Sequence, residues 1–72
     1  MMMQESLTDL ELEVALISEY KCFLLNEEET FIFNDEVVDI YFEGNYHYLA
    51  YGQHRWRLEV IAKEIYDFKI IS

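Results

Sequence analysis

The 72-residue sequence predicts an α+β domain in which an N-terminal helix packs on a small antiparallel β-meander of about four to five strands. Two observations predict the meander. Alternating apolar runs are separated by Gly44-Asn45 and again by Gly52-Gln53, and these residues tolerate the backbone of tight hairpin turns. A third observation, two overlapping capping patterns near the N-terminus, predicts the helix. No linker, repeat or low-complexity stretch interrupts the chain, so we expect a single domain over residues 1–72.

The helix is expected over about residues 7–18. Ser6 with Asp9, and Thr8 with Glu11, each match the spacing of a capping box at a helix start. The same segment also alternates apolar and polar residues, as a strand does, and the capping patterns favour the helix. We expect one apolar face of this helix to cover the sheet. The residues of that face are Leu7, Leu10, Val14 and Ile17.

Five β-strands are expected after the helix, at about residues 20–25, 29–33, 37–43, 46–51 and 55–61. The two-residue turns set the register, with Tyr41 opposite Tyr48 and Leu49 opposite Trp56. Both turns give the same inner face, and this agreement supports the meander. Its residues are Val38, Ile40, Phe42, His47, Leu49, Tyr51, Trp56 and Leu58.

The two ends of the meander are less sharply patterned. Phe31 and Phe33 join the inner face if a turn lies around Asn34-Asp35-Glu36. Residues 64–71 suit either a strand or a helix, because both spacings of apolar residues are present there. We favour a β continuation with a break near Ala62-Lys63.

The charge is large and unevenly distributed. The net charge is -10, and residues 1–50 contain twelve of the fifteen acidic residues but one basic residue, Lys21. Residues 51–72 are nearly balanced. A negative field repels nucleic-acid phosphates and anionic membranes and attracts basic surfaces. We therefore expect a basic protein as partner, and neither nucleic acid nor a membrane.

No pattern in the sequence predicts catalysis, a cofactor or a metal. The two glycines suit turns, not a phosphate-binding loop. Cys22, the single cysteine, stands in an apolar run and is expected to be buried and structural. His47 and His54 match no ligand spacing, and His47 is expected in the core or at its edge. The run Glu27 to Glu29 is interpreted as a solvated acidic turn, because it lacks the ligand pattern of a calcium loop.

The N-terminal segment and the cysteine count also predict the cellular compartment. The N-terminus has neither a basic segment nor a long apolar segment. A single cysteine fits a reducing compartment. We expect a cytoplasmic protein, in the host cytoplasm if it is viral.

The outer sheet face is predicted to bring three tyrosines together. Tyr41, Tyr46 and Tyr48 are expected side by side there, next to Asp39 and Glu43. Tyrosine is enriched at interface cores because it offers rigid, amphipathic contact area. This face is therefore an interface candidate. The alternatives are a solvated face and a face covered by the helix.

In size, acidity and lack of catalytic residues, the chain resembles small phage proteins that inhibit host DNA-binding proteins by mimicking DNA. These proteins share no sequence motif, so the resemblance is one of type. It implies a stoichiometric, often dimeric inhibitor that occupies a nucleic-acid-binding site. The near-neutral last third departs from an evenly acidic mimic. The residues that carry the resemblance are Glu5, Asp9, Glu11, Glu13, Glu19, Glu27, Glu28, Glu29, Asp35, Glu36, Asp39 and Glu43.

The predicted function is therefore that of a non-catalytic acidic inhibitor bound to a basic nucleic-acid-binding protein, with a homodimer as a further hypothesis. One alternative is a structural or accessory subunit that binds through the tyrosine face and Trp56. A second is an antitoxin or immunity protein. The predicted partner-binding residues are Glu11, Glu13, Glu19, Glu27, Glu28, Glu29, Asp35, Glu36, Asp39, Glu43, Tyr41, Tyr46 and Tyr48.

Overall fold

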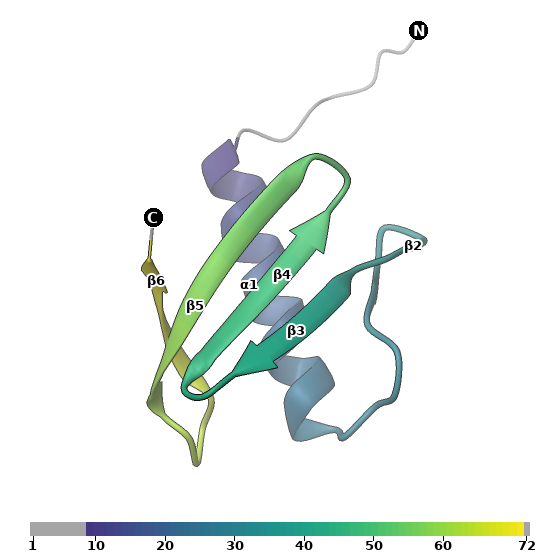
Figure 1. Cartoon of the computed structure of the whole chain (residues 1–72). Coiled ribbons are helices and arrows are strands. Elements are labelled where there is room, and N and C mark those ends of the chain that lie inside the picture. Colours follow the sequence, from purple (N-terminus) through teal and green to yellow (C-terminus); the bar gives the residue numbers. More distant parts are fainter. Residues whose placement is uncertain (1–8, 72) are drawn as a thin grey trace, which may run out of the picture.

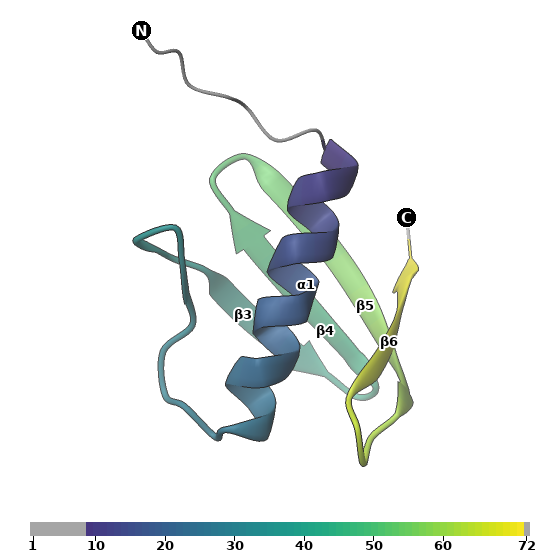
Figure 2. The same ribbon diagram turned by 180° about the vertical axis from the view of Figure 1, so that it is seen from behind.

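The computed structural model describes residues 9–71 and has the predicted α+β architecture. One helix lies across one face of a four-stranded antiparallel sheet, and a short two-stranded ribbon connects the two (Figures 1 and 2). The strand order in the sheet is β3-β4-β5-β6. The elements are α1 (Asp9–Leu25), β1 (Ile32–Phe33), β2 (Glu36–Val37), β3 (Asp39–Glu43), β4 (Tyr46–Tyr51), β5 (His54–Ala62) and β6 (Asp67–Ile71).

The two predicted hairpins are confirmed with their register. Tyr41 pairs with Tyr48, and Leu49 pairs with Trp56. Gly44 and Gly52 begin the two turns with φ values of 61° and 60°. Side chains with a Cβ are strained in this left-handed region, so the glycines are there because the turns require it.

The core lies between α1, the ribbon and the inner face of the sheet. The turn at Asn34 and Asp35 brings both Phe31 and Phe33 into this core, as predicted. No helix within residues 9–71 is both long and apolar enough to cross a membrane. The buried residues are Leu12, Leu16, Tyr20, Phe23, Phe31, Phe33, Val38, Leu49 and Leu58.

The predicted helix is too short and faces the wrong way. Residues 20–25 are the last turns of α1, so the strand predicted there is wrong. Tyr20 and Phe23 continue the helical spacing of Leu12 and Leu16 into the core. These aromatic rings bury more area than any residue on the expected face, which explains why this side of the helix faces inward.

The expected helix face is correspondingly exposed. Leu10 is 67 % exposed and Val14 60 %, although Ile17 packs at the margin of the core. The predicted start of the helix, with its caps Ser6 and Thr8 and the apolar Leu7, lies outside the described residues.

Several strand boundaries also differ from the prediction. The run 29–33 contributes only β1, and the run 37–43 is divided between β2 and β3. Val38 separates these two strands and donates its backbone N–H to the Phe31 carbonyl at 2.9 Å. The C-terminal segment is a strand, as favoured, and the predicted break is the turn at residues 63–66 between β5 and β6.

Candidate functional site

A partly buried hydrogen bond joins the helix to the sheet. The Tyr20 hydroxyl lies 2.6 Å from His47 Nδ1. Burial, with the charge of nearby Lys63, lowers the pKa of His47, so the neutral imidazole is favoured. Burial also raises the pKa of Tyr20 far above its usual range. A protonated phenol and a neutral imidazole therefore share this hydrogen bond, which connects α1 to β4.

The side chains of Cys22, His47 and His54 do not converge on a common point where a metal could bind. His54 stacks on Trp56 with ring centroids 5.6 Å apart, whereas His47 is half-buried beside Tyr20. Within residues 9–71, no three His, Cys, Asp or Glu side chains gather where they could hold a metal ion. Cys22 is exposed on α1, so its predicted burial is wrong. That prediction came from the apolar run around Cys22, and the helix turns this side chain away from the core.

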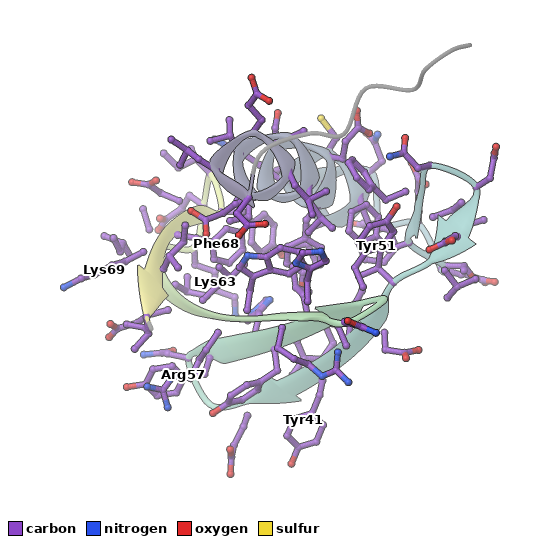
Figure 3. All side chains as sticks on the ribbon, turned by 90° about the horizontal axis from the view of Figure 1, so that it is seen from above. Tyr41, Tyr51, Arg57, Lys63, Phe68 and Lys69 are labelled. Carbon is purple, nitrogen blue, oxygen red and sulfur yellow. The ribbon has the colours of Figure 1, made fainter. Side chains whose placement is uncertain are left out.

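The outer face of the sheet holds the three tyrosines together, on the side opposite α1. The rings of Tyr41 and Tyr48 lie 5.7 Å apart across β3 and β4. The Tyr48 hydroxyl donates to Glu43 Oε1 at 3.5 Å, and the Arg57 guanidinium lies 5.8 Å from the centre of the Tyr46 ring. Figure 3 shows Tyr41 and Arg57 pointing away from the helix. The helix therefore leaves this face uncovered.

Charges on the outer face are arranged by strand. β3 contributes the acids Asp39 and Glu43, whereas β5 contributes Arg55 and Arg57 and, opposite Tyr46, the acid Glu59. Asp39, Ala50 and Arg55 form one cross-strand row, so opposite charges stand two strands apart with a small residue between them. A shallow hollow of about 180 Å³ lies between them, bordered by the rings of the Tyr41 and Tyr48 pair. Tyr41 and Tyr48 thus lie between the acids of β3 and the two arginines of β5.

The largest group of predicted acidic residues gathers along the side of the molecule formed by β3, the ribbon and the C-terminal end of α1. In Figures 1 and 2 the segment from α1 to β3 runs along this side, away from β5 and β6. Residues 22–54 contain no lysine or arginine. All the acidic side chains of this group are exposed. We call this group the acidic edge, and its residues are Glu19, Glu27, Glu28, Glu29, Asp35, Glu36, Asp39 and Glu43.

The acidic residues of α1 lie on two flanks of the helix, and only one flank borders the acidic edge. Glu19 and Glu28 border the same hollow beside Phe31 and Cys22, although they belong to the helix and to the following loop. Glu11 stands two turns before Glu19 on the same flank of the helix. Glu13 instead borders a hollow with Arg55 and Trp56 on the other flank. The structure therefore separates Glu13 from the acidic edge.

The end of α1 carries acids where the fold does not favour them. The Glu27 and Glu28 N–H groups donate to the carbonyls of Leu24 and Phe23 at 3.1 and 3.2 Å, closing the helix with a Schellman motif. Glu27 occupies the left-handed position of this motif with φ 54°, where glycine is usual. The last turn has no basic residue, and carboxylates oppose the partial negative charge at a helix C-terminus.

No protein-family model, curated protein or solved structure matches this chain.

Proposed function

We propose that this chain is a non-catalytic binding protein whose acidic edge docks on the basic surface of a nucleic-acid-binding protein, with carboxylates in place of phosphates. The observation that carries the proposal is the presence of Glu27 at the C-terminal end of α1. Glu27 adopts a backbone conformation that favours glycine, beside a helix end that favours cations. A residue that is locally unfavourable for the fold points to a role outside it.

The distribution of charge supports the same proposal. The acids of the edge come from four elements and are all exposed, so few of them stabilise the fold. Exposed like charges repel one another, and a basic partner would relieve this repulsion. Because surface charges are screened over ~8–10 Å at physiological salt, the complex should weaken as salt rises.

The test is retention of nucleic-acid-binding proteins from a lysate at low salt, with elution in a salt gradient and by competing DNA. The edge variant neutralises five acids of the acidic edge. It carries the changes Glu27→Gln, Glu28→Gln, Glu29→Gln, Asp35→Asn and Glu36→Gln. The control variant neutralises five acids away from the edge and has the same net charge. It carries the changes Asp9→Asn, Glu13→Gln, Glu59→Gln, Glu64→Gln and Asp67→Asn.

We expect the edge variant to lose the retained proteins and the control variant to keep most of them. Equal loss from both variants would mean that only the total charge matters, and the proposal would then be wrong. Binding that is insensitive to salt would contradict it as well.

A second candidate function is supported by the outer sheet face. Tyr41 is 61 % exposed on a sheet face that α1 does not cover. An accessory subunit that docks by this face would use the tyrosines as its anchors, because aromatic residues dominate interface cores. Such a complex would depend on Tyr41 and Tyr48 more than on the acidic edge.

A further inference from the structure

Helix α1 has apolar residues on two sides, and only one side is used by the core. The second side has the spacing of four and three residues that is typical of helix pairing. We call it the outer stripe, and its residues are Leu10, Val14, Ile17, Lys21 and Leu24. Leu10 and Val14 are 67 % and 60 % exposed. Ile17 and Leu24 pack in part against the core, so Leu10 and Val14 are the apolar residues of the outer stripe that stay exposed in the described part of the chain.

The outer stripe continues onto the edge strand β6. Val14, Ile17 and Lys21 border a groove of about 350 Å³ whose other wall is formed by Phe68 and Ile70. Figure 2 shows α1 and β6 side by side on this face, and Figure 3 shows Phe68 between the helix and the sheet. The apolar surface is therefore wider than one helix face. The strand residues matter because two helices of 17 residues would by themselves form only a short coiled coil.

The charges of α1 indicate which partner fits. Lys21 is the only lysine or arginine of the helix and lies within the outer stripe, in the C-terminal half. The N-terminal half holds Asp9, Glu11 and Glu13. A second α1 in antiparallel orientation would bring each Lys21 beside the acidic half of the other helix. It would also oppose the two helix dipoles favourably. A parallel orientation would place lysine against lysine and acids against acids.

We propose that the outer stripe is the interface of a symmetric dimer, in which α1 of a second copy lies antiparallel to α1. Val14 then packs near Ile17 of the other copy, and Lys21 near its Leu10. Such an isologous interface uses the same patch twice, as two-fold dimers do. It lies on the β6 side of the helix, so the acidic edges of both copies remain free. The dimer does not depend on the proposed function.

The first test measures molar mass by light scattering and sedimentation over a range of concentrations. We expect the wild-type chain to be a dimer that dissociates on dilution. Val14→Arg should give a monomer with an unchanged circular dichroism spectrum, because the side chain is already exposed in the single chain. Ile32→Arg is the matched control, since Ile32 is 56 % exposed on β1 away from the stripe. That variant should remain a dimer.

The second test fixes the orientation with a short bismaleimide. With Val14 near Ile17 of the other copy, the two Cys22 positions lie ~20 Å apart along the helix axis, at 1.5 Å per residue. The wild-type dimer should therefore not be cross-linked through Cys22. A Cys22→Ser, Ser18→Cys variant brings its two cysteines to ~8 Å along the axis and should be cross-linked. A wild-type monomer at every concentration, a Val14→Arg dimer, or cross-linking through Cys22 would each overturn the proposed dimer.

Discussion

Tyr20 and His47 are 27 residues apart in sequence and share a hydrogen bond of 2.6 Å between the Tyr20 hydroxyl and Nδ1 of His47. Each ring also contacts Phe68, with centroid distances of 5.7 and 5.3 Å. One polar contact surrounded by aromatic rings thus fixes the middle of α1 over β4. Because burial favours the neutral imidazole and the protonated phenol, the stability of the fold depends on pH.

The pH dependence has a definite direction on the acid side. The pKa of His47 lies below its ordinary value of 6.5 in the folded chain, so the unfolded chain binds the proton first. The contribution of His47 is complete above about pH 6.5 and is lost as pH falls through that value towards the folded pKa. We expect the free energy of unfolding, measured by urea denaturation, to fall as the pH is lowered below about 6.5.

Replacing the two histidines separately shows which one is responsible. His47→Gln should remove most of this slope, whereas His54→Gln should leave it, because His54 is exposed and stacked on Trp56. A slope that persists in His47→Gln would assign it to the carboxylates. On the alkaline side the raised pKa of Tyr20 implies a loss of stability as pH rises above its ordinary value of 10.0.

Two leucines of α1 distinguish its two sides. Leu16 is fully buried, so Leu16→Ala should cost about 2–5 kcal/mol, a large part of the stability of a domain this small. Leu10→Ala should change the free energy of unfolding by about 0.5 kcal/mol or less, measured at a dilution at which any dimer has dissociated. Thermal denaturation followed by circular dichroism compares the two variants. Equal losses would contradict the orientation of the helix.

Glu27→Gly should stabilise the fold. The change removes a side chain from the left-handed position at φ 54°, and it removes a carboxylate from the end of a helix. The strain of a side chain in this region is roughly 1–2 kcal/mol, part of which is offset because glycine loses more chain entropy on folding. We expect a net gain of about 1 kcal/mol in urea denaturation.

Glu29→Gly is the matched control for this change, because it removes the same charge at a position without positive φ. It should give no gain in stability. If the acidic edge binds a basic partner, Glu27→Gly should also weaken that complex while strengthening the fold. A variant that gains stability and keeps full binding would mean that Glu27 has no part in the interface.

The hairpins were predictable because their determinants are local. Gly44 and Gly52 fix two-residue turns, and the alternation of side chains then allows one register with an apolar inner face. The orientation of α1 was not predictable in this way, because Leu10 with Val14 and Leu12 with Leu16 are equally good apolar pairs. Helix propensities differ by less than ~0.7 kcal/mol per residue for the residue types in Tyr20–Leu25, so contacts with Phe31 and Phe68 decide that this segment is helical.

The candidate surfaces likewise include one that the sequence predicts and one that it does not. The three tyrosines of the outer face follow from strand register, and their proximity was predicted correctly. The acidic edge depends on how the loop and ribbon fold back along β3, so the separation of Glu13 from Glu19 needs the three-dimensional structure. The bond between Tyr20 and His47 leaves no sequence signal, because it joins a helix and a strand through a contact distant in sequence.

The Tyr41 and Tyr48 pair gives the final prediction, which concerns the outer face. Cross-strand aromatic pairs contribute about 0.5–1.5 kcal/mol beyond their burial. Tyr41→Thr and Tyr48→Thr keep β propensity and remove the ring contact of 5.7 Å. A double-mutant cycle in urea should therefore give a coupling energy of about 0.5–1.5 kcal/mol. The double variant should keep its circular dichroism spectrum, since neither ring belongs to the buried core.

The same double variant separates the two candidate functions. A partner that docks on the outer face should lose its affinity for this variant, whereas a partner of the acidic edge should bind it with unchanged salt dependence. The edge variant with five neutralised acids should give the opposite pattern. Binding that both variants abolish would place Asp39 and Glu43, which belong to the acidic edge and to the outer face at once, at the centre of a single interface.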